Sequence, residues 1–249
     1  MDTCAWLRRS PYLHHAIVLG FFAALSAVPA HATITNLVTN GSFENTGGLV
    51  SSYEITSSNL PGWSISDATV YSVACVVFPG TAASNPCGVP IVFYGGTTSP
   101  DGGNFVAIDG GSTYTATLSQ MVTGLTIGQS YQVSFYMATS QISGYAGTTD
   151  DQWQVNFGSQ PAQYSTTVVN PSQGFTGWIS QTLTFTADNT SDLLSFLATG
   201  TPNSEPPMLF LDGISVTGQS SAPEPATCGL MILGLAGVFA VARRLKNRT

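Results

Sequence analysis

The chain has 249 residues, of which only 8% are charged, and its formal net charge is −7 at pH 7. Every Lys, Arg and His lies outside the stretch 33–222. Eleven of the thirteen acidic residues lie inside it, the exceptions being Asp2 and Glu224, so the stretch has eleven carboxylates and no cationic side chain. Proteins bind phosphate backbones by neutralising them with Lys and Arg, so this composition excludes nucleic acid as a partner.

Residues 1–32 have the pattern of a secretory signal peptide. Two arginines precede an apolar run over residues 16–27, and Ala30 and Ala32 give the small-x-small pattern at which signal peptidase cuts. We expect cleavage after Ala32. An uncleaved anchor helix is the alternative, but the run is shorter than the roughly 20 residues that a membrane span needs.

Residues 33–217 are long enough for one domain with a sizeable core, and they indicate β-structure. Short runs alternate between apolar and polar residues, whereas the 3.6-residue period of a helix is absent. The clearest run places Tyr131, Val133, Phe135 and Met137 on one face. Strands are expected at 115–122, 131–138, 178–186, 193–198 and 208–216. This spacing predicts an all-β, antiparallel sandwich.

Cys75 and Cys87 are the two cysteines of this domain. A pair in an exported domain is typical of a disulfide, which here would contribute about 3 kcal/mol by closing the loop between them. A zinc site is not expected, because two cysteines without histidine do not supply four ligands.

The C-terminal end has three parts in a fixed order after a short linker at 218–222. Pro223, Glu224 and Pro225 precede an apolar run over 227–242, and a basic tail ends the chain. This order resembles a PEP-CTERM sorting signal, found on exported bacterial proteins that are substrates of exosortase, a membrane protease. The resemblance implies that Pro223, Glu224 and Pro225 form the recognition site of an exosortase-like sorting enzyme.

The physical properties of 227–242 agree with a membrane helix. Sixteen residues in a helix span about 24 Å, slightly less than the roughly 30 Å hydrocarbon core of a bilayer. The basic tail that follows would stay in the cytoplasm and leave the domain outside. We therefore expect a protein of the bacterial cell envelope or its exterior, anchored at least transiently by this helix.

Five short segments resemble, in their order, galactose-binding-domain-like jelly rolls and, more distantly, the carbohydrate-binding modules of cellulases and xylanases. They are a first strand at 36–44, the Leu-Pro-Gly-Trp sequence at 60–63, a strand at 104–110, the Leu-Ser-Gln sequence at 118–120 and a closing strand at 211–216. Residues 64–100 look like a local insertion. The resemblance implies a jelly-roll β-sandwich that binds carbohydrate, such as an exopolysaccharide, without catalysis.

The resemblance also implies a structural calcium held partly by Glu44 and Asp212. Asp212 lies at a spacing of two from Phe210 and Ile214, so alternation would direct its carboxylate toward the apolar face. The domain has no cation to pair with it, and calcium takes oxygen ligands. The alternative is that backbone amides or a bulge satisfy the Asp212 carboxylate, or that this group is protonated.

The candidate ligand-binding residues are Trp153, Tyr145 and Asp151, in a Gly-rich, polar region that we interpret as a loop at one end of the sandwich. Aromatic rings stack on sugars, and a few polar groups pair with hydroxyls. The alternative for Trp153 is a place in the core. Trp63 and Trp178 are assigned to the core.

The composition argues against an enzyme, because catalytic triads, Schiff bases and phosphate clamps need the His, Lys or Arg that this domain lacks. A carboxylate-based glycosidase remains an alternative, with Glu54 and Asp67 as a possible pair, since Asp150 and Asp151 would point to opposite faces of a strand. A structural or ice-binding matrix protein is another, from the row Thr182, Thr184 and Thr186.

Overall fold

The computed structural model describes residues 35–219, except 52, 56–58, 67–73, 83–85, 88–90, 97 and 114, together with 234, 237, 243, 244, 246 and 247. The chain divides into one compact unit over Ala32–Ser221 and a second made of its two ends. Within the described residues, no helix has the length and apolar character needed to cross a membrane. The predicted signal peptide, the Pro-Glu-Pro motif and nearly all of the predicted helix at 227–242 lie outside the described residues.

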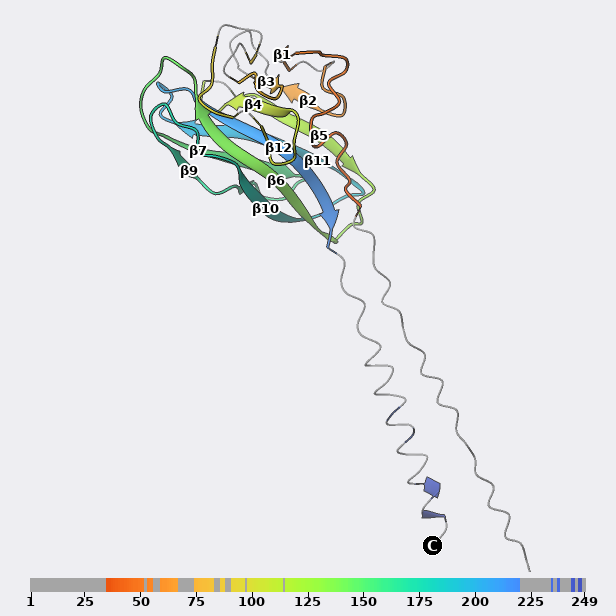
Figure 1. Cartoon of the computed structure of the whole chain (residues 1–249). Coiled ribbons are helices and arrows are strands. Elements are labelled where there is room, and N and C mark those ends of the chain that lie inside the picture. Colours follow the sequence, from red (N-terminus) through yellow and green to blue (C-terminus); the bar gives the residue numbers. More distant parts are fainter. Residues whose placement is uncertain are drawn as a thin grey trace, which may run out of the picture. The chain divides into compact units, whose positions relative to one another are not determined.

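The large unit is a sandwich of two antiparallel sheets, as predicted (Figure 1). Sheet 1 has the order β1-β3-β4-β12-β6-β10; sheet 2 has the order β2-β5-β11-β7-β8, with β9 also paired to β7. The strands are β1 (Tyr53–Glu54), β2 (Ser64–Ser66), β3 (Ala74–Val77), β4 (Phe105–Asp109), β5 (Thr117–Thr123), β6 (Ser130–Gln141), β7 (Thr149–Phe157), β8 (Gln163–Tyr164), β9 (Val168–Asn170), β10 (Ile179–Thr186), β11 (Ser191–Thr201) and β12 (Pro207–Gly218).

The main core lies between the two sheets and is built by alternation along the strands. In β6, Val133, Phe135 and Met137 are buried, while the residues between them are partly exposed. Sheet 2 contributes Trp153 and Phe196, whose rings meet edge to face with centroids 6.1 Å apart. Fully burying one such large apolar side chain stabilises the fold by about 1.5–3 kcal/mol.

A second apolar cluster lies on the outer face of sheet 1. In β12, Leu209 and Leu211 belong to the main core, whereas Met208 and Phe210 belong to the second cluster, as alternation requires. Phe210 packs against Phe93, Phe105, Phe175 and Trp178, with ring centroids 4.9–6.2 Å apart. The segment after β3 and the loop before β10 thus cover this face.

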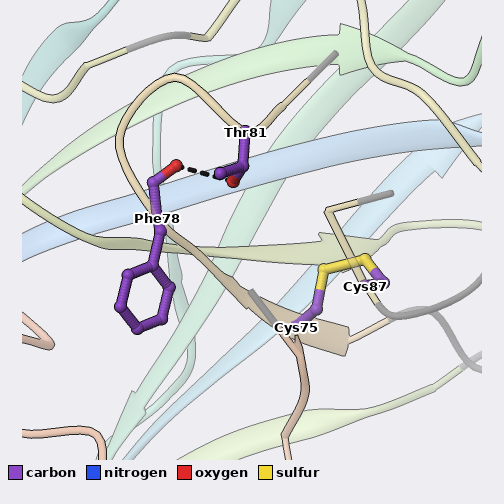
Figure 2. Close-up of a disulfide and its surroundings, with 4 residues drawn as sticks. All are labelled: Cys75, Phe78, Thr81 and Cys87. Atoms are coloured by element: carbon purple, nitrogen blue, oxygen red, sulfur yellow. Dashed lines mark hydrogen bonds between the residues drawn. A yellow bond between two sulfur atoms is a disulfide. The ribbon is translucent and has the colours of Figure 1, made fainter. Parts of the chain in front are cut away.

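The predicted disulfide between Cys75 and Cys87 is confirmed and belongs to this cover (Figure 2). Cys75 lies in β3 and Cys87 in the segment that follows, with Cα atoms 5.1 Å apart. Between them the chain reverses in a turn in which the Phe78 carbonyl accepts hydrogen bonds from the backbone amide and hydroxyl of Thr81.

The N-terminal half departs from expectation at one point. Residues 64–100, which look like a local insertion in the sequence, contribute β2 to sheet 2 and β3 to sheet 1. The predicted first strand at 36–44 is an irregular segment, since the chain turns at Asn40, whose carbonyl accepts a hydrogen bond from the Phe43 amide. This segment follows the end of β12 through the bonds Leu37 N to Val216 O and Ile214 N to Gly41 O.

Candidate functional site

A groove of about 430 Å³ lies on the outer face of sheet 2. Its floor comes from the outward-facing residues of β7 and β11, and one wall comes from the glycines that follow β4. The lining residues used below are Asp150 and Gln152 of β7, Thr199 of β11, Thr167 and the pair Gly110-Gly111. Leu197 and Ala198 of β11 also line the groove, so polar side chains lie at its surface although most of its exposed lining is apolar.

Hydrogen bonds hold the groove's polar side chains in place. The Thr167 hydroxyl donates to Gln152 Oε1 at 3.0 Å, and the Thr199 hydroxyl donates to the Gln152 carbonyl at 2.9 Å. Gln152 and Thr199 are also register partners in the ladder between β7 and β11. The side-chain amide of Gln152 has no hydrogen-bond partner among the residues that the structure describes, so it is available to a ligand.

An exposed aromatic ring lies beside the groove. Tyr164 of β8 is 50% exposed and pairs in register with Gln154, the next outward-facing residue after Gln152 along β7. Its hydroxyl donates to Gln154 Oε1 at 3.4 Å. Residues two apart on a strand are separated by about 7 Å, so Tyr164 stands beside the continuation of the groove's floor along β7 without lining the groove itself. The sequence interpretation did not select Gln152 or Tyr164.

Trp153, the predicted sugar platform, lies in the core. It is fully buried, packs against Phe196, and its indole N–H donates to the Phe210 carbonyl of the opposite sheet at 3.3 Å. A ring with no exposed face cannot stack on a sugar. The region that we interpreted as a loop up to Trp153 is instead strand β7 from Thr149 onward.

The three candidate residues do not form one surface site. Asp151 is fully buried and directed between the sheets, whereas Tyr145 is exposed on the loop between β6 and β7. Asp150 is exposed, so it and Asp151 point to opposite sides of β7, as expected for adjacent strand residues. For the other carboxylate pair, the Glu54 side chain and Asp67 lie outside the described residues.

The buried Asp151 carboxyl has an unusual environment. Its Oδ2 accepts a hydrogen bond from the Thr149 hydroxyl at 2.9 Å, while Oδ1 has no partner within the described part of the chain. Burial raises the pKa of Asp151 to about 7; the Thr149 and Thr139 hydroxyls oppose the rise, and the negative charges of Asp150 and Asp109 add to it. The carboxyl therefore changes charge near neutral pH.

Asp212, a predicted calcium ligand, is also fully buried. Neither of its carboxylate oxygens has a well-formed hydrogen bond to a described residue, although the Ser99 hydroxyl and the Gly213 amide lie near enough to act on it. Burial raises the pKa of Asp212 to about 8; Ser99 and the Gly213 amide lower it, and the nearby charges of Asp101 and Glu44 raise it further. The structure thus brings Glu44 close to Asp212, although the two are 168 positions apart in the sequence.

The face that Asp212 occupies differs from the sequence argument. A bulge between Asp212 and Ser215 changes the phase of β12, so Ile214 points into the main core while Phe210 points outward. Asp212 pairs in register with Tyr136 and shares the outer side of sheet 1 with Phe210. A bulge adds one residue to a strand, which is why spacing alone placed Asp212 and Ile214 together.

The donors around Asp212 fit a hard cation in kind. Carboxylates of Asp212, Glu44 and Asp101 and the Ser99 hydroxyl are oxygen ligands of the type that calcium takes, and the two unpartnered oxygens of Asp212 are the strongest sign of a missing partner. Among the described residues, no three His, Cys, Asp or Glu side chains converge on one point. Glu44 Oε1 already accepts the Asn104 amide at 2.7 Å.

The threonine row is present on the edge strand β10. Thr182, Thr184 and Thr186 are all exposed, and Thr182 Oγ1 lies 3.1 Å from Ser134 Oγ of β6. These side chains lie on the outer face of sheet 1, beyond the part that the second apolar cluster covers.

This chain matches a known sorting-signal family at its C-terminal end and is distantly similar to several solved structures. Residues 221–247 match the family described as the PEP-CTERM protein-sorting motif, which confirms the tail and indicates export and envelope-associated sorting. Halomucin of Haloquadratum walsbyi (strain DSM 16790 / HBSQ001) is 28% identical over 218 residues, covering 84% of this chain. The chain spans about 2% of the length of that relative.

Carbohydrate-binding modules are among the similar solved structures. TmCBM61 in complex with β-1,4-galactotriose has a TM-score of 0.44 at 16% identity, covering 74% of this chain and 99% of that chain. A family 16 carbohydrate-binding module has a TM-score of 0.37 at 17% identity, covering 73% and 99%. The enzymatically active domain of bacteriophage CBA120 tailspike protein 4 has a TM-score of 0.41 at 12% identity, covering 74% of this chain and 21% of that chain. These similarities are too distant to indicate a function, so the function must be inferred from the domain's own side chains.

Proposed function

We propose that this protein is exported and that its sandwich domain binds carbohydrate, without catalysis, on the outer face of sheet 2. The observation that carries the proposal is the groove there, where Gln152, Thr167 and Thr199 present amide and hydroxyl groups beside an exposed Tyr164 ring. Sugars are bound by a small number of placed donors and acceptors together with an aromatic face.

The groove's chemistry favours binding over turnover. Hydrolysis of a glycosidic bond needs two carboxyl groups that flank the bond, with one kept protonated. Asp150 is the one carboxylate among the described lining residues, and Asp151 lies beneath the strand, on its other side. A soluble-glycan assay that detected reducing ends released by the domain would contradict this part of the proposal.

Substitutions in the groove test the binding surface directly. Gln152→Ala and Tyr164→Ala should each weaken affinity for an oligosaccharide ligand about fivefold or more, because each removes a contact group without touching the core. Isothermal titration of neutral galactan, xylan and glucan oligomers is the measurement. Thr184→Ala, an exposed threonine on sheet 1, is the matched control. Binding that survives both groove substitutions would place the glycan site elsewhere.

The tail is proposed to deliver the domain to the envelope. An exosortase-like enzyme would recognise Pro223, Glu224 and Pro225, and residues 227–242 would anchor the chain in the membrane at least until that step. Deleting all residues after Ala222 should release the domain into the soluble fraction. Retention of the truncated protein in membranes, when the isolated domain binds neither lipid nor glycan, would contradict this role.

A structural calcium at Glu44 and Asp212, with Asp101 and Ser99 nearby, completes the proposal. Calcium would neutralise the buried carboxylate that lacks a hydrogen-bond partner, and backbone carbonyls would supply further ligands. Micromolar to millimolar calcium should raise the melting temperature at fixed ionic strength, because a ligand that binds only the folded state stabilises it. Asp212→Asn should abolish this response. Equal melting temperatures of the unmodified protein in calcium and in chelator would remove the site.

A further inference from the structure

We infer that the groove on sheet 2 selects glycans that carry protonated amino groups, such as oligomers of glucosamine. This inference rests on the proposed carbohydrate binding and narrows its ligand class. It comes from the carboxylates that surround the groove and from the lack of any cation to balance them.

Three carboxyl groups lie around this one groove. Asp150 lines it and is exposed. Asp109, at the end of β4, lies behind the wall, where its Oδ1 accepts the Gly111 amide at 2.7 Å. Asp151 lies beneath the floor: a Cβ placed on Gly200, its register partner, would come within 2.6 Å of Asp151 Oδ1. The negative charges of Asp150 and Asp109 each act on Asp151, so both lie within electrostatic range of it.

No side chain of the domain balances this charge. The sequence has no Lys, Arg or His between residues 33 and 222. Asp150 has neither a hydrogen bond nor an ion pair among the described residues. The Debye length is about 8 Å at physiological ionic strength, so a ligand inside the groove feels these nearby charges with little screening. An ammonium group there is attracted, and a uronate or sulfate group is repelled.

The two buried carboxyls add a response to the ligand. Burial raises the pKa of Asp109 to about 6 and that of Asp151 to about 7. Near neutral pH, a fraction of these two carboxyl groups is therefore protonated and uncharged. A bound ammonium group would favour the ionised forms, so its binding should release protons.

The same carboxylates do not make a chelating site for a metal ion. Asp150 points outward from β7 and Asp151 inward, and Asp109 is engaged with a backbone amide. No three acidic side chains converge within the described residues. Charges spread around a groove suit an organic cation that occupies the groove, whereas a divalent metal needs ligands that meet at one point.

The test compares two ligands with one skeleton: fully deacetylated and fully N-acetylated chito-oligosaccharides of the same length, titrated at pH 6.5 in chelator. The deacetylated oligomer should bind more tightly, and raising NaCl from about 50 to about 500 mM should weaken it while leaving the acetylated oligomer unchanged. Asp150→Asn should reduce binding of the deacetylated oligomer about fivefold, the range of one partly exposed ion pair, with little effect on the acetylated one.

Asp188→Asn is the matched control, because Asp188 lies in the turn before β11 and the groove lies at the other end of that strand. Equal affinities for the two oligomers, or tighter binding of a galacturonate oligomer, would overturn this inference and leave the proposed carbohydrate binding intact. Equal losses in Asp150→Asn and Asp188→Asn would also overturn it, because net charge rather than the groove would then be responsible. Failure to bind any glycan would overturn both.

Discussion

The outer face of sheet 1 is covered by other parts of the chain and that of sheet 2 is exposed, although both sheets are antiparallel and six-stranded. On sheet 1, Ala107, Ala138 and Phe210 face outward and are buried beneath a second apolar cluster. On sheet 2, the outward residues of β7 are Asp150, Gln152, Gln154 and Asn156, which remain at least partly accessible. The apolar outer face of sheet 1 is covered, whereas the outer face of sheet 2, with its amides and carboxylates, stays exposed.

This difference suggests that sheet 1 contributes mainly to stability and sheet 2 mainly to the proposed binding. Covering sheet 1 increases the buried apolar area and uses the segment closed by the disulfide. Sheet 2 gives up that stabilisation and keeps a polar surface of hydrogen-bonding groups. Changes on sheet 1 should therefore alter stability and spare binding, and changes on sheet 2 should do the reverse.

The largest expected effect is loss of the aromatic at the centre of the cover. Phe210→Ala should lower the free energy of unfolding by about 4 kcal/mol, because it removes a fully buried ring with four aromatic neighbours. Gln154→Ala on sheet 2 should change it by no more than about 0.5 kcal/mol. Urea unfolding monitored by tryptophan fluorescence measures both. Similar losses in the two variants would erase the distinction between the faces.

Removing the disulfide should have the next largest effect. The double substitution of Cys75 and Cys87 by Ala should cost about 3 kcal/mol, since the unfolded chain regains the freedom of the closed loop. Glycan affinity should stay within twofold of the unmodified protein when measured well below the melting temperature. A large loss of affinity at full folding would show that the cover and the groove are coupled.

The pH dependence of Asp151 is on the order of 4 kcal/mol in total, but it is spread over about three pH units, so its effect at each pH step is smaller than the losses above. Its folded pKa of about 7 exceeds the ordinary aspartate value of 3.8, so the proton is held more tightly in the folded state. Its contribution to stability is present below pH 4 and is lost as the pH rises through about 7. Relative to the unmodified protein, Asp151→Asn should therefore gain stability between pH 4 and pH 8 in chelator, as thermal melts can measure.

Asp188 provides the contrast in sign. Hydrogen bonds from Ser159, and a further one from Gln160, hold the pKa of this exposed carboxyl below its usual range. Asp188→Asn should therefore lose stability relative to the unmodified protein as the pH rises toward 4, and the difference should stay constant at higher pH. The same slope in both Asn variants would contradict the assigned causes.

The sequence predicted most of the sandwich but not the strand that carries the groove. Gly144, Gly147 and the adjacent aspartates suggested a loop, although Trp153, Val155 and Phe157 alternate with amide residues in a regular strand pattern. Counting that alternation would have placed Trp153 inside and Gln152 outside. The positions of Thr167 and Tyr164 depend on β8 and β9, which are too short to give a pattern.

Other features were beyond sequence reasoning for a physical reason. The bulge after Asp212 changes which face each later residue occupies, and its only local sign is one glycine, Gly213. The second cluster on sheet 1 makes both faces of β3 and β4 apolar, so alternation could not show which face meets sheet 2. By contrast, the cysteine pair and the tail were predictable because each depends on local composition.

The position of β12 would have a mechanical consequence under the proposed anchoring of the domain by its tail. The chain leaves the sandwich at the end of β12, so tension on the tail enters the domain through this strand. β12 pairs with β6 from Pro207 to Gly218 and with β4 on its other side, and Asn36 Oδ1 also accepts the Val216 amide at 2.9 Å. A pulled chain must therefore come away from two neighbours at once rather than peel from an edge. The sheet under tension is sheet 1, so a domain held by its ligand on sheet 2 can be strained without the force passing first through the groove.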